Sequence, residues 1–288
     1  MGWSSAGLPD LTGRRIVVTG ANSGIGAAAA AAFAGAGAHV VLAVRDTARG
    51  AAAAARMSGS TEVRELDLAD LSSVRRFAAG LDGNVDILVN NAGVMVVPQG
   101  RTVDGFETHI GTNHLGHFAL TNLLLPRITG RVVTVASLAH QFGRLDPTDL
   151  SFQQRRYQRW PAYAQSKLAN LLFTAELARR LTAAGSPVAA MACHPGYSAT
   201  KLGTHTGNRV MNTGLAVLDR FAQNAVAGAR PTLFAATADL PTDSYVGPDG
   251  PGEMWGAPKL VGRSGRARDG VAAEALWTVS ERLTGTGR

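Results

Sequence analysis

Tyr163 and Lys167 stand four residues apart in the segment YAQSK, and their types could do chemistry together. Lysine is rare in this chain, because only three of its 28 basic residues are lysines. Four residues is about one helical turn, so the two side chains would share a face of a helix. A functional pair would bring an ammonium group close to a phenol, where it would favour the phenolate. The alternative is a surface lysine one turn from a half-buried tyrosine, and the spacing alone favours that alternative.

A glycine-rich turn near the start of the chain could bind a phosphate. In VVTGANSGIGAAA, Gly20, Gly24 and Gly26 follow a β-branched run and precede an alanine-rich helical pattern. Glycines so placed permit a tight turn, let the backbone approach a pyrophosphate and allow close packing of helix on strand. Amides at the helix N-terminus would then meet the anion. The position between strand and helix favours a dinucleotide site over a simple turn.

The end of the second predicted strand, VLAVRDT, indicates which dinucleotide is bound. An acidic residue there binds the ribose 2′-hydroxyl of NAD, while an arginine suits the 2′-phosphate of NADP. Val44 fills the position of the acid and Arg45 follows it. A guanidinium matches a phosphate in shape and charge. Alternatively, Arg45 is simply solvated, with Asp46 partly offsetting its charge. The sequence therefore favours NADP(H), with NAD(H) as the alternative.

The pattern of apolar residues predicts the elements that must position these groups. Short β-branched bursts predict strands at 15–20, 39–44, 62–67, 85–91, 131–137 and 187–193, with a further strand indicated at 243–248. Helical patterns occupy 24–36, 47–57, 71–80, 103–127, 160–184 and 271–283. Alternating strands and helices predict an α/β fold with a doubly wound parallel sheet of the Rossmann type. We expect one domain over residues 1–288.

Three irregular segments stand out from this pattern. Segments 138–160 and 197–213 follow the carboxyl ends of predicted strands, where ligands bind in such sheets. We expect them to be the substrate loops. Segment 247–270 is rich in Gly, Pro and Arg and predicts a C-terminal tail before the last helix.

The charge balance bears on the class of partner. The chain has a net charge of +7 and a pI of about 10.3, which would suit a nucleic-acid binder. However, its arginines are dispersed in pairs such as Arg14–Arg15 and Arg179–Arg180, without interleaved aromatic residues. This dispersal favours a basic surface and a small-molecule partner, with no nucleic acid.

Cysteine usage and hydropathy favour a cytoplasmic protein. The single cysteine, Cys193, allows no internal disulfide, and His194 has no partner at metal-ligand spacing, so we expect no metal. Segment 16–44 carries no formal charge, but Thr19, Asn22 and several glycines interrupt it. It therefore predicts neither a membrane span nor a signal peptide.

Several motifs together resemble one known family. The segments TGANSGIG, NNAG at 90–93, NHLGHF at 113–118, VASLAH at 135–140, YAQSK and HPGYSAT at 194–200 occur in the order and spacing of the short-chain dehydrogenase/reductases. The resemblance covers nearly the whole chain. The segments AYAQSKLANLLFTAELARRL and GRSGRARD look most like the retinol-dehydrogenase-like, WW-domain-oxidoreductase-like branch. The resemblance to this family implies an enzyme that transfers a hydride between a nicotinamide cofactor and a carbonyl or alcohol carbon.

The resemblance also implies catalytic roles. Tyr163 matches the family's general acid/base, and Lys167 matches the lysine that lowers the pKa of the phenol and binds the nicotinamide ribose. Ser137 matches the serine that holds the substrate oxygen. Asn113 matches the asparagine that supports a water chain from the lysine to solvent. The neighbouring His114 and His117 are interpreted as packing histidines.

The cofactor site is implied in the same way. Asp67 resembles an adenine-contacting aspartate, and Asn90 would help to steady the central strand. Pro195, Gly196 and Thr200 resemble the segment that binds the nicotinamide carboxamide, although Ser198 replaces the β-branched aliphatic residue common there. The full predicted set is Gly20, Asn22, Ser23, Gly24, Ile25, Gly26, Arg45, Asp67, Leu68, Asn91, Ala92, Gly93, Tyr163, Lys167, Pro195, Gly196 and Thr200.

Substrate and assembly are less determined. The two loops carry an apolar mixture that favours a lipophilic ketone, aldehyde or secondary alcohol, or that merely packs the loops: Leu138, Phe142, Tyr157, Trp160, Tyr197, Leu202 and Met211. Segment 160–184 has apolar residues on more than one side, so we expect a homo-oligomer, a dimer or tetramer. The alternative function is a non-catalytic, cofactor-binding regulator on the same fold.

Overall fold

An eight-stranded sheet forms the centre of the molecule, which is described here from a computed structural model over residues 7–197 and 224–287. The strand order is β3-β2-β1-β4-β5-β6-β7-β8. All neighbouring strands are parallel except β7 and β8. The strands are β1 Arg15–Thr19, β2 His39–Val44, β3 Ser60–Glu65, β4 Val85–Asn90, β5 Ile128–Val135, β6 Ala189–Cys193, β7 Tyr245–Pro248 and β8 Pro258–Leu260. This confirms the predicted doubly wound, Rossmann-type α/β fold.

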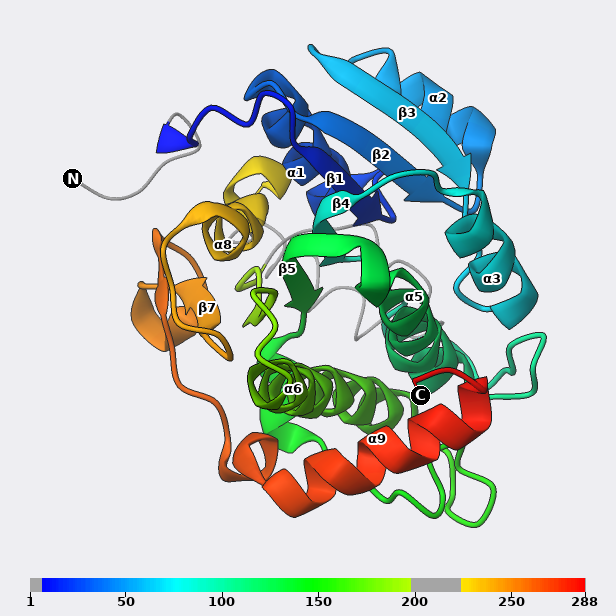
Figure 1. Ribbon diagram of the computed structural model, residues 1–288. Coiled ribbons are helices and arrows are strands. Elements are labelled where there is room, and N and C mark those ends of the chain that lie inside the picture. The colour runs from blue at the N-terminus through cyan, green and yellow to red at the C-terminus, as the bar shows by residue number, and fades with distance from the viewer. Residues whose placement is uncertain (1–6, 198–223, 288) are drawn as a thin grey trace, which may run out of the picture.

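Helices cover both faces of the sheet (Figure 1). Helices α1 (Gly24–Gly35), α2 (Thr47–Ala54) and α8 (Ala225–Thr237) share one core with the sheet. On the other face lie α3 (Leu71–Gly80), α5 (Gly116–Leu124) and α6 (Arg159–Ala183). Helix α9 (Gly270–Thr284) lies outside α5 and α6. The strand order runs outwards in opposite directions from β1 and β4, which opens a crevice at their carboxyl ends.

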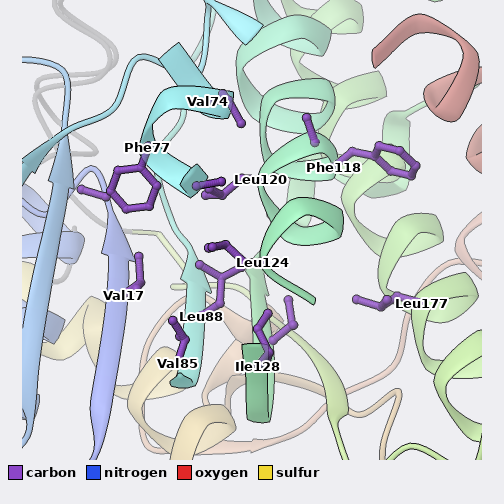
Figure 2. Close-up of a cluster of buried hydrophobic side chains, with 14 of the residues drawn as sticks. Val17, Val74, Phe77, Val85, Leu88, Phe118, Leu120, Leu124, Ile128 and Leu177 are labelled. Atoms are coloured by element: carbon purple, nitrogen blue, oxygen red, sulfur yellow. The ribbon is translucent and has the colours of Figure 1, made fainter. Parts of the chain in front are cut away.

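The core beneath α3 and α5 shows why these segments fold as they do. Strands β1, β2, β4 and β6 are buried on both faces, so they read as nearly continuous apolar runs. Figure 2 shows Phe77 of α3 and Leu120 and Leu124 of α5 turned towards Val17 of β1 and Leu88 of β4. Packing of this kind fixes the carboxyl ends of β1, β4 and β5 at one edge of the sheet.

Several elements differ from the sequence predictions. Strand β3 begins and ends two residues before the predicted 62–67. The predicted helix 103–127 is the short α4 (Thr108–Ile110), a π-helical turn at Gly111–Leu115 and then α5. Helix α8 was not predicted, because its small residues and interior Pro231 give no helical periodicity. The predicted tail 247–270 contains strand β8, which pairs antiparallel with β7; this pairing was not predicted from the sequence.

Helix α9 covers the apolar side of α6 that faces away from the sheet. The Trp277 ring stacks on Phe173 of α6, with centroids 5.8 Å apart, and meets Phe118 of α5 edge-on at 4.9 Å. The Arg180 guanidinium lies over the Trp277 ring, 4.4 Å from its centroid. The apolar residues of 160–184 from which we predicted a homo-oligomer are therefore buried within the same chain, partly by α9, so they no longer support that prediction. Across the described residues, no helix is long and apolar enough to cross a membrane.

Trp277→Ala should lower the free energy of unfolding by about 3–5 kcal/mol, because it empties the space between α9, α5 and α6. Chemical denaturation of the purified chain measures this loss. Val271→Ala is the matched control on the same helix, since Val271 is 80% exposed, and its effect should stay within about 0.5 kcal/mol. Equal effects of the two substitutions would show that α9 contributes little packing.

Candidate active site

The glycine-rich turn joins β1 to α1 at the crevice. Gly20 has φ +67°, a left-handed conformation that favours glycine. A Cβ on Gly26 would lie 2.4 Å from the Asn91 amide nitrogen and 2.6 Å from the Gly20 carbonyl oxygen, so only glycine fits there. Asn22 and Ile25 are partly exposed in this turn. Ser23 stands at the N-cap position of α1, is exposed, and makes no side-chain capping hydrogen bond. With no acidic residue in its first turn, the start of α1 suits an anion.

The end of β2 and the residues that follow it differ in exposure. Val44 is buried and packs against Gly50 of α2. Arg45 is exposed at the carboxyl end of the strand. The Asp46 carboxylate accepts the Arg49 backbone amide at 2.9 Å and so caps α2. Asp46 therefore has a structural task of its own at this helix start.

The turn after β3 carries two further predicted cofactor residues. The Asp67 carboxylate accepts the backbone amide of Ala69 at 2.9 Å, and its own amide donates to the Ser73 hydroxyl at 3.0 Å. Leu68 is buried. A Cβ on Gly116 would come 2.3 Å from the Leu68 carbonyl oxygen, so α5 approaches this turn closely. These contacts hold Asp67 and Leu68 at the same edge of the sheet as the glycine turn.

The loop after β4 lies between the glycine turn and Asn113. The Asn91 side chain donates to the Thr19 carbonyl at 2.8 Å, and the backbone amides of Asn91 and Ala92 both donate to the Thr19 hydroxyl at 2.9 Å. A Cβ on Gly93 would lie 3.1 Å from the Asn113 side-chain oxygen. Asn90 is anchored below the loop, where its side chain donates to Thr121 at 2.9 Å.

Asn113 lies in the π-helical turn and is fully buried. Its side-chain oxygen accepts the Val94 amide at 2.8 Å, and its nitrogen donates to the Val94 carbonyl and to the Ser166 hydroxyl, each at 2.9 Å. Ser166 in turn donates to the Tyr163 carbonyl at 2.7 Å. The Asn113 amide therefore ties the loop after β4 to the turn of α6 that carries Tyr163.

Ser137, Tyr163 and Lys167 come together at the carboxyl end of β5. Ser137 begins a short 3-10 helix, Leu138–Phe142, and its hydroxyl is hydrogen-bonded with the Tyr163 phenol. The Lys167 ammonium donates to the Val135 carbonyl at 3.0 Å and lies 5.8 Å from the centre of the Tyr163 ring. Both α6 side chains are buried. The surface-lysine interpretation of YAQSK is therefore wrong.

Burial dominates the electrostatics of this group. It raises the pKa of the Tyr163 phenol, and the hydrogen bond with Ser137 acts in the opposite direction. The sequence analysis expected Lys167 to lower the pKa of Tyr163. In the protein without cofactor, burial has the larger effect, so this pKa is raised instead. Burial also lowers the pKa of Lys167 to about 8, because the ammonium loses solvation. Lys167 can thus exchange a proton near neutral pH.

The residues after β6 are held by a loop that the sequence did not connect to them. Gly196 has φ +69°, and a Cβ there would meet the Met254 carbonyl oxygen at 2.4 Å. The buried His194, just before Pro195, accepts the Gly196 amide at 3.2 Å and donates to Glu253 at 3.0 Å. His194 and Glu253 lie 59 positions apart, so no local pattern signals the pair.

One predicted cofactor residue and most of one predicted loop cannot be placed. Thr200 and segment 198–213 lie outside the described residues, as do Leu202 and Met211. The other loop, 138–160, includes the 3-10 turn after Ser137 and ends at the first turn of α6.

An apolar group borders the Tyr163 ring. Met95 and Ala139 pack against Tyr163, and the Trp160 ring lies 5.7 Å from it. Trp160 is 49% exposed and Phe142 70% exposed, unusually high for large aromatic side chains. Met95 was missed from the sequence, because nothing local places it beside α6.

A buried polar network behind Tyr163 was also missed. His109 donates from Nδ1 to Glu107 at 2.7 Å and accepts the Val97 amide on Nε2 at 3.2 Å. Tyr157 donates to the Val97 carbonyl at 3.0 Å. The His109 ring meets Tyr163 edge-on at 6.1 Å. Only the close Glu107–His109 spacing was visible in the sequence. Within the described ranges, no group of three or more His, Cys, Asp and Glu side chains could hold a metal ion.

Comparison with known proteins gives consistent matches. Residues 14–210 match the short chain dehydrogenase family. Human retinol dehydrogenase 13 is 41% identical, over 98% of this chain and 87% of its own length. The crystal structure of an uncharacterized protein from Mycobacterium Paratuberculosis is 58% identical, with a TM-score of 0.88 over 99% of this chain and 98% of its own.

A more distant structure contains a cofactor. It is described as an NAD(P)-dependent gluconate 5-dehydrogenase from Beutenbergia cavernae with bound NADP at low occupancy. It is 28% identical, with a TM-score of 0.60 over 79% of this chain and 91% of its own. The fold, the family match and the retinol dehydrogenase relatives agree: the chain belongs to the short-chain dehydrogenase/reductase family, on its retinol-dehydrogenase-like branch, and is an NAD(P)-dependent oxidoreductase.

Proposed function

We propose that this enzyme interconverts a lipophilic carbonyl compound and its alcohol, with NADP(H) as its preferred cofactor. The observation that carries the proposal is the group formed by Ser137, Tyr163 and Lys167: the Ser137 hydroxyl interacts with the Tyr163 phenol, and the buried Lys167 ammonium lies 5.8 Å from the centre of the Tyr163 ring. Asn113 ties this group to the loop beside the glycine turn.

The chain's own residues fit a dinucleotide at the crevice. A Cβ on Gly26 would occupy space beside Gly20 and Asn91, so the turn is built for close backbone approach. The uncapped start of α1 would hold the pyrophosphate, and Asp67, Leu68, Asn91, Ala92 and Gly93 would line the adenosine and ribose path. Pro195 and Gly196 would face the carboxamide. The cofactor supplies or accepts the hydride.

The proton is handled by Tyr163 and Ser137. Ser137 would donate a hydrogen bond to the substrate oxygen and hold it against the phenol, which then gives or takes the proton. A charged Lys167 favours the phenolate, and its pKa of about 8 lets it replace the proton that Tyr163 loses. The same ammonium, with three donors, would bind ribose hydroxyls.

The substrate preference rests on the apolar group beside Tyr163. Met95, Ala139 and the half-exposed Trp160 place apolar atoms beside the Tyr163 ring. This apolar group favours an apolar carbonyl compound over a polyhydroxylated one. The named retinol dehydrogenases among the relatives support a lipophilic substrate.

Tyr163→Phe should lower kcat by at least about 100-fold, the usual scale for a positioned acid or base. Cofactor affinity should stay within a few-fold, because the ring remains. Steady-state kinetics with a lipophilic aldehyde and a fluorescence titration of NADPH measure the two effects. Tyr245→Phe is the control, since the Tyr245 hydroxyl is buried and has no hydrogen-bond partner among the described residues. Turnover by Tyr163→Phe within a few-fold of wild type would exclude Tyr163 as proton donor.

Lys167→Met should stabilise the cofactor-free protein at pH 7 while it abolishes turnover. A buried lysine with a pKa of about 8 costs roughly 3 kcal/mol relative to its ordinary value of 10.5. The cost is complete below pH 8 and disappears as the pH rises to 10.5, because the unfolded chain binds the extra proton only in that window. Asn170 still donates to the Val135 carbonyl at 3.1 Å, so we expect a net gain of about 2 kcal/mol. Denaturant unfolding at pH 7 and pH 10.5 tests this; equal gains at both pH values would contradict it.

Arg45→Ala should weaken NADPH binding by about tenfold and barely change NADH binding, because only NADP carries the 2′-phosphate. Val44→Asp should tilt the preference towards NADH, since a carboxylate accepts the 2′-hydroxyl and repels the phosphate. Because Val44 is buried against Gly50, this variant should also be less stable than wild type. Titration of both reduced cofactors measures these changes. Arg56→Ala removes the same charge from an exposed position just beyond the end of α2 and is the control. Equal losses for the two cofactors in Arg45→Ala would assign Arg45 a structural role.

A further inference from the structure

Two histidines of the Asn113 region are completely buried but face different parts of the molecule. His114 contacts the Ser280 hydroxyl of α9 at 2.9 Å through Nε2. His117 contacts the Asn113 carbonyl at 3.0 Å through Nδ1 and the Thr19 hydroxyl at 2.9 Å through Nε2. Each is about 1% exposed. The sequence interprets both as packing residues, but only His117 points towards the proposed cofactor site.

The hydrogen bonds of His117 determine its tautomer. A carbonyl oxygen can only accept, so Nδ1 carries the proton that bonds to Asn113. Burial lowers the pKa of His117 to about 4, so the ring is neutral and Nε2 must accept. The Thr19 hydroxyl therefore donates its one proton to Nε2, which leaves both of its lone pairs for other donors.

Those two lone pairs are both used. The backbone amides of Asn91 and Ala92 donate to the Thr19 hydroxyl, each at 2.9 Å. The hydroxyl thus has its full complement of one donated and two accepted hydrogen bonds. The Val89 carbonyl lies 3.4 Å from the Thr19 hydroxyl and is its alternative acceptor; the Asn91 amide also donates to this carbonyl at 3.0 Å. Without an acceptor at His117, the hydroxyl proton would turn towards the Val89 carbonyl, and the geometry at Asn91 and Ala92 would change. The hydrogen bonds of His117 and Thr19 thus connect three segments: the end of β1 before Gly20, the loop after β4, and the π-helical turn.

From this geometry we propose that His117 is a positioning residue that holds the glycine turn and the loop after β4 in register with the Asn113 carbonyl, and so sets cofactor affinity. The inference rests on the proposed cofactor site. It differs from a packing role, because packing predicts that His117 and His114 contribute alike. The proposed positioning role predicts that substitution of His117, but not of His114, changes cofactor affinity.

The test compares substitutions that remove one or both bonds. His117→Leu removes both. His117→Asn keeps a donor near the Nδ1 position for Asn113, and His117→Gln keeps a group near the Nε2 position for Thr19. His114→Leu is the matched control, with equal burial on the same helical segment. Thr19→Val removes the hydroxyl at constant shape, and Thr19→Ser restores it.

The first readout is the dissociation constant for whichever of NADPH or NADH wild type binds more tightly, determined by fluorescence titration. His117→Leu and Thr19→Val should each weaken binding by about tenfold, since each leaves buried polar groups without partners. Thr19→Ser should bind within about threefold of wild type, and His114→Leu should match wild type. The Thr19→Val/His117→Leu double variant should bind the cofactor almost as tightly as the single variant with the lower affinity, because both substitutions break the same hydrogen-bond network.

The second readout uses the cofactor-free protein. Amide hydrogen exchange at Asn91 and Ala92 should accelerate in His117→Leu and Thr19→Val, while His114→Leu should accelerate exchange in α9 instead. His117→Gln should protect these two amides better than His117→Asn does. Melting temperatures of all variants show whether changes in affinity merely follow lost stability.

The outcomes separate this inference from the proposed function. If His117→Leu and His114→Leu bind the cofactor equally well, or if affinity follows the melting temperature across the series, the positioning role is overturned while the proposed function stands. If wild type binds neither reduced cofactor, the proposed function and the inference built on it both fail. Selective loss in His117→Leu and Thr19→Val, with recovery in Thr19→Ser, establishes the role.

Discussion

The contact between the carboxyl ends of β1 and β4 is the constraint on which the candidate site depends. These two strands are neighbours in the sheet although two strands and three helices separate them in the chain. Their junction is closed by the Thr19 hydroxyl, which receives two amides of the loop after β4. Because the glycine turn follows Thr19 directly, any shift at this junction would move the predicted phosphate-binding amides relative to Asn113.

Burial of polar groups is the second recurring feature of the site. Asn113, Lys167, His117 and His194 all lie within the folded chain, and each makes hydrogen bonds that its burial requires. Burial has opposite consequences for the two ionisable groups of the YAQSK turn. It raises the pKa of Tyr163 and lowers that of Lys167. Both shifts favour the uncharged forms, so a charged ligand or a cofactor charge has a strong influence there.

Helix α9 shows how one chain can satisfy a surface that would otherwise need a partner. Its Trp277 fills the space between α5 and α6, and its Ser280 reaches the buried His114. The apolar residues on the outer side of α6 thus have an intramolecular explanation. The same helix α6 also carries Tyr163 and Lys167 of the proposed site, and Lys167 is hydrogen-bonded to β5.

The sequence by itself determined the order of strands and helices, the glycine turn and the family. The family follows from the resemblance of several motifs taken together. The strands, the helices and the glycine turn depend on residues that are close in the chain, through apolar periodicity and the glycines Gly20 and Gly24. Their physical causes are local, so they can be recognised before any tertiary contact is known. Where the local signal was weak, as in α8 with its interior Pro231, the prediction failed.

The tertiary structure alone decided which side chains share an environment. His117 reaches Thr19 across 98 positions, and His194 reaches Glu253 across 59. Neither pair leaves a pattern in the sequence, because a hydrogen bond between distant segments depends on how helices pack on the sheet. The same holds for the burial of Lys167, which is one lysine among three in the sequence but becomes a group with a pKa of about 8 only when α6 lies against β5.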